Sequence, residues 1–567
     1  MPVGLTPDDV VDRETLGVLG EVDDHPIPKH TVLAGHEVHG QPGKMTPRVD
    51  GTDPVPAHVG NVEAGAHLLG QGLSVGLHRT IPLSRHGGWT REVGHVHGPF
   101  TSSRPSLTSD AYAGLSGPRG SDVGDEVGMS AVLQVNGGTP LKGEISVRGA
   151  KNFVSKAMVA ALLGESPSEL RNVPQIKDVE VVSGLLRLHG VTVDYDVEAG
   201  VIRLDSSDVE TAHVADIDAH AGSSRIPILF CGPLLHRLGE AFIPDLGGCR
   251  IGDRPIDYHL SILREFGAVV DKRPQGIHIT APRGLTGAKI QLPYPSVGAT
   301  EQLLLTAVRA KGKTELSNAA TEPEIMALIA FLQRMGAIIS VDTDRVIRIE
   351  GVDRLGGATY TALTDRIEAG SWACAALATG GDIMVRGADQ HGMMAFLNTF
   401  RKVGGDFEVT DDGIRFWHPG GELKSIVLET DVHPGFMTDW QQPLVVALTQ
   451  ATGLSIVHET VYENRFGFTE ALRGMGAQIQ VYRECLGGSP CRFGHRNFNH
   501  SAVVSGPTPL KAADIEVPDL RGGFSHLIAA LAAEGTSRVS GIDIIYRGYE
   551  DFMGKLHALG ADVTQLA

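Results

Sequence analysis

The chain carries six copies of one local pattern, in which a helix-like segment ends at a glycine and a strand-like segment follows. Apolar residues before each glycine have the spacing of an amphipathic helix face, and a glycine just past a helix is a common C-cap. The alternating residues after each glycine are typical of a half-buried strand. The six glycines lie 68 to 84 residues apart, at Gly190, Gly267, Gly336, Gly404, Gly476 and Gly560.

This period constrains the fold. The common solenoids repeat every 20–50 residues or so, which is too short for this chain. A unit of about 70 residues can carry two helices and several strands. Six such units predict an α/β protein with two pseudo-symmetric domains of three units each. The alternative is an ordinary multi-domain α/β protein whose glycines recur by coincidence, and six occurrences argue against it.

Residues 1–128 differ from the repeats. They hold ten of the 24 histidines and twelve of the 31 prolines, and they show no sustained period of two or 3.6. This composition predicts a poorly ordered or dispensable N-terminal extension. The histidine spacings are irregular and do not favour a metal site. Met129 directly precedes the first strand-like run, AVLQVNG, and would serve as a natural start.

The bulk composition excludes several classes of protein. Hydrophobic residues make up 42% of the chain, and the formal net charge is -18. That charge argues against non-specific binding to nucleic acid or to an anionic membrane surface. No apolar run approaches the roughly 20 residues of a membrane span, and the first residues do not resemble a signal peptide. We therefore expect a cytoplasmic protein. Five scattered cysteines do not indicate a disulfide framework.

The loop DLGGCRIGDRP is the strongest local candidate for chemistry. Cys249 follows two glycines, with Arg250 and Arg254 close by. Cationic neighbours lower a thiol pKa and make the thiolate available, so we interpret Cys249 as reactive. Cys231 and Cys374 lie in apolar segments and fit the alternative reading of a cysteine as a small buried hydrophobe.

Cations recur in the loops of other units. Guanidinium groups suit carboxylate and phosphate because their donors form a fork. Any one of these residues alone is an ordinary surface charge, but loops of equivalent units would meet in one cleft. The candidates are Lys151, Arg225, Arg465 and Arg547.

Carboxylates in these loops have two interpretations. Asp439 precedes an apolar helix, so it could act as a general base or simply cap the helix N-terminus. Glu322, Glu324 and Asp519 are open to the same two interpretations. Cys485 and Cys491, near His495 and His500, do not have a standard zinc spacing. We interpret that segment as a surface insertion and predict no metal.

The motifs together resemble the UDP-N-acetylglucosamine 1-carboxyvinyltransferase family of enolpyruvyl transferases. The resemblance runs from about Ala131 to Thr564, in the family's order. It rests on RGAKN, SSRIPILFCGP, GGCRIGDRP, PSVGAT, EPEI, DRIEAG, HPGFMTDWQ, ETVYENRF, PDLRGG and RGYE. It implies two inside-out α/β barrels of three βαβαββ units each. The domains would be residues 129–150 plus 365–567 and residues 151–364, with the active site between them.

The resemblance also implies roles for individual residues. Cys249, Asp439, Lys151 and Arg547 would be catalytic. Lys151, Asn152, Arg254 and Arg547 would bind phosphoenolpyruvate. The UDP-sugar would contact Asn152, Arg225, Arg254, Pro255, Ile256, Asp257, Tyr258, Tyr294, Pro295, Ser296, Val297, Asp439 and Val461. Arg465, Asp519 and Arg521 would give electrostatic support.

The implied reaction moves enolpyruvyl from phosphoenolpyruvate to the 3'-hydroxyl of UDP-N-acetylglucosamine, by addition and then elimination of phosphate. This is the first committed step of peptidoglycan precursor synthesis, and fosfomycin would alkylate Cys249. No cofactor, nucleic acid, membrane or obligate protein partner is expected. Tyr294, Pro295 and Trp440 depart from the family's usual residues, which bears on sugar specificity. The alternatives are a 3-phosphoshikimate 1-carboxyvinyltransferase and a non-catalytic regulatory paralogue that binds a UDP-sugar.

Overall fold

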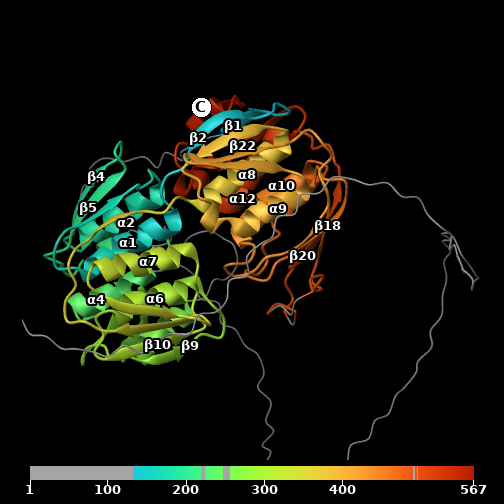
Figure 1. Cartoon of the computed structure of the whole chain (residues 1–567). Coiled ribbons are helices and arrows are strands. Elements are labelled where there is room, and N and C mark those ends of the chain that lie inside the picture. The colour runs from blue at the N-terminus through green and yellow to red at the C-terminus, as the bar shows by residue number, and fades with distance from the viewer. Residues whose placement is uncertain are drawn as a thin grey trace, which may run out of the picture. The chain divides into compact units, whose positions relative to one another are not determined.

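The computed structural model describes residues 132–218, 224–244, 246, 256–488, 492–494 and 496–566. Six β-sheets lie in this part of the chain, five with four strands and one with three. Helices alternate with the strands along the sequence (Figure 1). The predicted α/β class with six units is confirmed.

The four-stranded sheets share one pairing scheme. Counted in spatial order across each sheet, the first two strands are parallel to each other. The second and third strands are antiparallel, and so are the third and fourth. In spatial order the sheets are β21 (Asp514–Glu516), β22 (Thr536–Ser540), β1 (Val132–Asn136), β23 (Asp562–Leu566); β2 (Lys142–Ser146), β14 (Asp382–Arg386), β16 (Gly413–Trp417), β15 (Asp406–Thr410); β17 (Val427–Glu429), β18 (Gly453–His458), β20 (Ser501–Gly506), β19 (Gln478–Tyr482); β9 (Lys289–Gln291), β10 (Lys313–Ser317), β12 (Val346–Glu350), β11 (Ile338–Asp342); and β13 (Thr359–Thr361), β3 (Ser168–Arg171), β5 (Val201–Asp205), β4 (Thr192–Asp196). The described strands of the sixth sheet are β6 (Glu240–Ile243), β8 (Gly276–Thr280) and β7 (Val269–Arg273), all antiparallel.

Six amphipathic helices close the units, as the sequence predicted. They are α2 (Lys177–Leu188), α5 (Asp257–Glu265), α7 (Pro323–Arg334), α9 (Met394–Val403), α11 (Thr469–Gly474) and α13 (Phe552–Ala558). In α9 the buried face includes Phe396, Phe400 and Val403, at helical spacing. All six predicted glycines follow these helices with φ between +75° and +111°. Glycine is favoured there because a Cβ is strained in this left-handed region.

A second set of helices is buried on nearly all sides. It comprises α1 (Lys151–Ala160), α4 (Cys231–Arg237), α6 (Val297–Ala307), α8 (Arg366–Thr379), α10 (Thr438–Leu448) and α12 (Leu520–Ala532). Every residue of α8 from Arg366 to Leu377 is buried. Helices α8, α10 and α12 contact one another and lie side by side in Figure 1. A helix without a polar stripe is expected in a core, and this placement agrees with helices enclosed by sheets.

The short helices complete the described secondary structure. They are α3 (Val214–Asp218), η1 (Ala161–Leu163), η2 (Ile226–Phe230), η3 (Gln390–Gly392) and η4 (Ile542–Arg547).

Two hydrophobic cores are present in the described residues. One draws its residues from 133–147 and 369–563, and the other from 150–362. Strand β1 pairs with β22 and β23, and β2 pairs with β14, so the first strands join the C-terminal core. This distribution supports the predicted domain boundaries, which remain a prediction.

Candidate active site

Lys151 and Arg547 lie on either side of one carboxylate, Asp178. Lys151 is the first residue of α1, and its Nζ lies 2.7 Å from Asp178 Oδ2. Arg547 ends η4, and its Nε donates to Asp178 Oδ1 at 3.0 Å. Asp178 lies in the first turn of α2 and is 3% exposed. The structure thus brings together two predicted anion-binding cations that are almost 400 positions apart in the sequence.

The ionisation of Asp178 follows from these contacts. Burial acts to raise the pKa of Asp178, but the charges and hydrogen bonds of Lys151 and Arg547 outweigh it, and the pKa falls below its usual value. A buried carboxylate needs such partners to stay charged. The two cations are therefore held ready for an anion, with Asp178 as their present partner.

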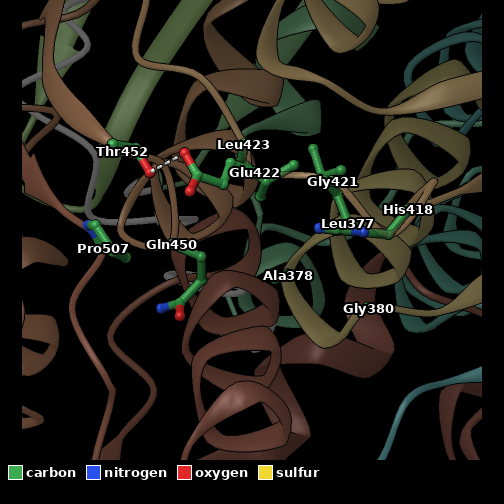
Figure 2. A pocket seen from close by; sticks show the side chains of 10 residues that line it. All are labelled: Leu377, Ala378, Gly380, His418, Gly421, Glu422, Leu423, Gln450, Thr452 and Pro507. Carbon is green, nitrogen blue, oxygen red and sulfur yellow. Dashed lines mark hydrogen bonds between the residues drawn. The ribbon is translucent and has the colours of Figure 1, made fainter.

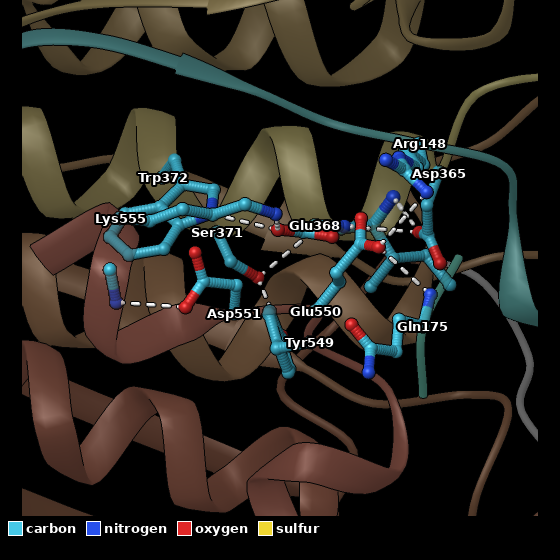
Figure 3. Close-up of polar contacts among 12 residues, drawn as sticks. Arg148, Gln175, Asp365, Glu368, Ser371, Trp372, Tyr549, Glu550, Asp551 and Lys555 are labelled. Carbon is cyan, nitrogen blue, oxygen red and sulfur yellow. Dashed lines mark hydrogen bonds and ion pairs between the residues drawn. The ribbon is translucent and has the colours of Figure 1, made fainter. Parts of the chain in front are cut away.

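A second carboxylate, Asp365, fixes the start of α1 against the start of α8. Its Oδ1 accepts from the backbone N–H groups of Ile367 and Glu368 as an N-cap, and its Oδ2 accepts from the backbone N–H of Lys151 at 3.2 Å. Figure 3 shows Asp365 near Glu368, which pairs with Lys555 at 2.6 Å. The backbone of Lys151 is positioned by a capping residue from a distant segment.

Asp439 and Arg465 form the second close pair of predicted site residues. Asp439 is the second residue of α10, and its Oδ1 lies 2.6 Å from Nη2 of Arg465. The N-cap of α10 is Met437, so the interpretation of Asp439 as a helix cap is wrong. The Asp439 carboxylate turns toward a cation instead of the helix amides.

Arg465 is fully buried around this pair. Burial acts to lower the pKa of Arg465, but Asp439, Asp519 and Glu459 raise it overall. Its Nε and Nη1 find no hydrogen-bond partner among the described residues. Asp519 accepts from the backbone N–H of Gly522 at 3.0 Å near the start of α12, so for Asp519 the capping interpretation holds. An unsatisfied buried guanidinium is costly, and its free donors can serve a ligand.

Tyr294 and Val461, two predicted UDP-sugar residues, share a contact with the insertion. The Arg492 guanidinium lies 4.1 Å from the Tyr294 ring centre and donates to the Val461 carbonyl. The Tyr294 hydroxyl is buried without a partner among the described residues, and burial raises the pKa of Tyr294. Ser296 caps α6, which begins at Val297, by accepting from the Ala299 N–H.

The other predicted residues are scattered along the same loops. Asn152 follows Lys151 in α1, Arg225 precedes η2, and Asp257 and Tyr258 begin α5 directly after Ile256. Pro295 lies between Tyr294 and the cap Ser296. Cys249, Arg254 and Pro255 lie outside the described residues, and for Arg521 only the backbone, in α12, is described. Cys231 and Cys374 are fully buried, as expected.

Comparison with known proteins decides the family. A UDP-N-acetylglucosamine 1-carboxyvinyltransferase of Protochlamydia amoebophila is 49% identical over 438 residues, which are 76% of this chain and 94% of that protein. The same-named protein of Chlamydia abortus is 45% identical, over 77% of this chain and 98% of its own length. The chain belongs to the UDP-N-acetylglucosamine 1-carboxyvinyltransferase family. The sequence model of EPSP synthase (3-phosphoshikimate 1-carboxyvinyltransferase) also matches, over residues 135–556.

Solved structures agree on the fold of this family. The enolpyruvyl transferase NikO from Streptomyces tendae superimposes with a TM-score of 0.69 at 22% identity, over 77% of this chain and all of that one. An EPSP synthase from Acinetobacter baumannii gives a TM-score of 0.58 at 17% identity, with the same coverage. At these identities the comparison establishes the two-domain α/β fold alone. Within the described residues no helix is both long and apolar enough to cross a membrane.

Sequence reasoning on this member of the family missed several residues that organise the site. Asp178 lies outside the quoted motifs, Glu459 opens the motif ETVYENRF but was given no role, and Arg492 lies in the insertion. Glu459 is fully buried and accepts from Thr438, Gln441 and two backbone N–H groups. Only the stretch of charges in QIKDVE, just before an apolar helix face, singles out the region of Asp178.

Glu324, one of the carboxylates with two interpretations, has a structural partner. Its two oxygens each accept from Arg366 at 3.0 Å, and both side chains are buried. Burial alone would raise the pKa of Glu324, but Arg366 lowers it overall. Glu322 nearby keeps one oxygen without a partner among the described residues, and burial raises its pKa.

Two surface cavities are lined by residues other than the predicted site residues. One, of about 350 Å³, is lined by ten residues that include His418, Glu422 and Thr452, and none is a predicted site residue (Figure 2). The other, of about 860 Å³, is lined by residues 144–148, 175–180 and 546–558 in part. The lining of this second cavity includes Arg148 and Glu550, and Nη1 of Arg148 lies 3.5 Å from Oε1 of Glu550 (Figure 3).

Proposed function

We propose that the chain transfers the enolpyruvyl group of phosphoenolpyruvate to the 3'-hydroxyl of UDP-N-acetylglucosamine and releases phosphate. This would be the first committed step of peptidoglycan precursor synthesis, carried out in the cytoplasm. The observation that carries the proposal is the sharing of Asp178 by Lys151 and Arg547. Such a pair of cations suits a substrate that bears both a phosphate and a carboxylate.

In this proposal, phosphoenolpyruvate takes the place of Asp178 on the two cations. Lys151 offers a compact charge with three donors, and Arg547 offers a planar fork for two oxygens. Asn152 and Arg254 complete this part of the site. The substrate must bring more negative charge than one carboxylate to displace it, and phosphoenolpyruvate does so.

Asp439 is proposed to take the proton from the sugar 3'-hydroxyl. The hydroxyl oxygen then bonds to C2 of phosphoenolpyruvate while Cys249 delivers a proton to C3. The bond from C2 to the phosphate oxygen then breaks while the Cys249 thiolate takes a proton from C3, which restores the double bond. A placed base and fixed counter-charges are the usual sources of such rate enhancement. The close Arg465 guanidinium orients the Asp439 carboxylate before the reaction.

The UDP-sugar is proposed to lie along Arg225, residues 254–258, residues 294–297 and Val461, with Asp519 and Arg521 in support. Contacts of Arg492 with Tyr294 and Val461 support the grouping of two of these segments. The site would then be built between the domain of residues 151–364 and the domain of residues 129–150 plus 365–567.

The decisive experiment measures phosphate release by the purified chain with phosphoenolpyruvate and each of two acceptors. We expect release with UDP-N-acetylglucosamine and none with shikimate 3-phosphate. Release with shikimate 3-phosphate would overturn the proposal in favour of the sister activity. A folded chain that binds the UDP-sugar but releases no phosphate would favour a regulatory paralogue.

A separate experiment tests the thiol. Incubation with UDP-N-acetylglucosamine and fosfomycin should add one inhibitor mass, and peptide mapping should place it on Cys249. The buried Cys231 and Cys374 serve as internal controls, because burial raises the pKa of both thiols. An unmodified Cys249 would contradict its assignment as the reactive thiol.

A further inference from the structure

Three side chains of the types that ligate metals lie close together where the connection between β19 and β20 meets strand β18. His458 is the last residue of β18, and Cys485 and His500 lie near the two ends of the connection. One ligand atom from each residue lies within 4.8 Å of the others. His458 and His500 are fully buried, whereas Cys485 is exposed.

The hydrogen bonds of His500 define which ring nitrogen is available. Its Nδ1 lies 2.8 Å from the carbonyl oxygen of Phe498, which can only accept, so Nδ1 carries the hydrogen. The neutral ring then has a bare lone pair on Nε2. That Nε2 lies 3.2 Å from Sγ of Cys485.

The same argument applies to His458 through Ser501. The Ser501 hydroxyl has one hydrogen, which it donates to the carbonyl of Glu484 at 2.7 Å. In the hydrogen bond of 2.8 Å between His458 Nδ1 and Ser501 Oγ, the donor must therefore be the N–H of His458. Its Nε2 carries a lone pair, and this buried atom has no hydrogen-bond partner among the described residues.

We propose that His458, Cys485 and His500 bind a divalent transition-metal ion, best zinc, that ties the connection to the sheet. Imidazole nitrogens and a thiolate are the ligands zinc prefers. Around tetrahedral zinc, ligand atoms should lie about 3.4–3.6 Å apart, given Zn–N and Zn–S bonds of about 2.0–2.3 Å. The observed spacing needs only small side-chain movements to reach that arrangement.

The surroundings match those of structural metal sites. Each histidine donates its other ring N–H to an oxygen, which fixes the ring and its tautomer. The connection also packs closely here, since a Cβ on Gly487 would lie 2.4 Å from the His458 ring. On binding, Cys485 loses its thiol proton to solvent, while both histidines bind through existing lone pairs. The fourth position of the metal is left for a further ligand.

This site differs from the interpretation of the insertion drawn from spacing. The pattern of Cys485 and Cys491 with His495 and His500 lacked a standard zinc spacing, and Cys491 and His495 lie outside the described residues. His458, 27 positions before Cys485, was not part of that pattern. The antiparallel pairing of β18 with β20 brings it there, with His458 opposite Ser501.

Cobalt substitution of the full-length chain tests the proposal. Cobalt(II) bound to a thiolate gives a charge-transfer band in the near ultraviolet, which the histidines of residues 1–128 cannot produce. We expect the band in the native chain under reducing conditions and its loss in Cys485→Ser. His391→Ala is the matched control, because the exposed His391 side chain lies elsewhere and should leave the band unchanged.

Zinc content gives an independent readout. After dialysis against zinc and removal of the excess, Cys485→Ser and His458→Gln should each retain about one zinc per chain less than the native chain and His391→Ala. Absence of the cobalt band in the folded native chain would overturn the proposal. So would equal zinc content in all four proteins, or a Cys485–Cys491 disulfide that persists under reducing conditions.

Discussion

At the scale of the residue, the contacts of Asp178 organise the proposed site. Asp178 pairs with two cations that are far apart in the sequence, Lys151 and Arg547. Its lowered pKa keeps the carboxylate charged at any pH at which the protein would work. The substrate must therefore compete with a charged group and not with a neutral one. The ion pairs also position Lys151 and Arg547 before any ligand arrives, which lowers the entropy cost of binding.

Substitution of Asp439 tests its proposed role as base. In Asp439→Asn the side chain keeps its size but cannot accept a proton. We expect kcat for phosphate release to fall about 10²–10⁴-fold, with a smaller change in KM. Steady-state kinetics with both substrates measures the effect.

Asp411→Asn is the matched control for this substitution, because Asp411 is exposed in the turn between β15 and β16. Its kinetics should equal those of the native chain. Native kcat in Asp439→Asn, or a similar loss in both variants, would argue against Asp439 as the base.

Glu301 provides a prediction on pH. Glu301 is buried in α6, and burial raises its pKa to about 7 despite Lys156, whose Nζ lies 3.6 Å away. A raised carboxyl pKa means that the folded state holds a proton that the unfolded state releases above its ordinary pKa of 4.5. The contribution of Glu301 to stability should therefore fall as the pH rises from 4.5 to about 7.

Glu301→Gln removes this titration. Its free energy of unfolding should rise relative to that of the native chain across the same pH window and then level off. Urea unfolding at several pH values measures the difference. A difference that does not change with pH would show that the Glu301 carboxyl titrates normally.

At the scale of the element, the six helix-ending glycines are the feature that could be predicted most fully from sequence. Gly190 and Gly560, at the two ends of the repeat, have the same left-handed conformation as the four between them. Their prediction succeeded because a C-cap is local: the helix periodicity, the glycine and the next strand all lie within a few residues.

Two glycines at the end of α11 separate backbone strain from packing. Gly476 has φ of +99°, and among the described residues one atom, at an ordinary 3.8 Å, lies near the position of a Cβ. Gly474 is the last residue of α11, and no described atom lies within 4 Å of its Cβ position. Gly476→Ala should lower the free energy of unfolding by about 1–2 kcal/mol. Gly474→Ala should leave it unchanged or raise it by up to about 1 kcal/mol.

Denaturant unfolding of the two variants, side by side, checks this prediction. Both add one methyl group at the same helix end, so destabilisation in Gly476→Ala alone isolates the backbone conformation as the cause. Equal destabilisation would mean that packing dominates at this end of α11.

The contacts of the site could not be predicted in this way. Asp178 meets Arg547, and Glu324 meets Arg366, only because separate units come together in three dimensions. Nothing in the spacing of these residues specifies the contact. Asp439 shows the same limit, since the local pattern left both a helix cap and a general base open, and its contact with the distant Arg465 could not be read from that pattern. The motif resemblance predicted that Lys151 and Arg547 belong to one site, but it did not predict that the carboxylate of Asp178 lies between them.

At the scale of the whole molecule, the prediction concerns the extension. The chain matches its relatives over 76–77% of its length, and its match to the EPSP synthase sequence model begins at residue 135. A protein that begins at Met129 retains every described strand and helix. We expect it to release phosphate with the same kcat and KM as the full-length chain, within about twofold.

Kinetics of the two proteins at equal concentration, with circular dichroism to verify folding, test this expectation. A large loss of activity in the folded shorter protein would mean that residues 1–128 contribute to catalysis.

Strand β1 lies between β22 and β23, and Val132 is the register partner of Leu566. The beginning and the end of the described fold are thus adjacent residues of one sheet, a few ångströms apart. The described chain therefore ends in the same sheet in which it begins. A short peptide could join these two ends, and new termini could be opened in an exposed turn of another unit. We expect such a circularly permuted chain to adopt the same fold, because the fold does not depend on which unit is synthesised first.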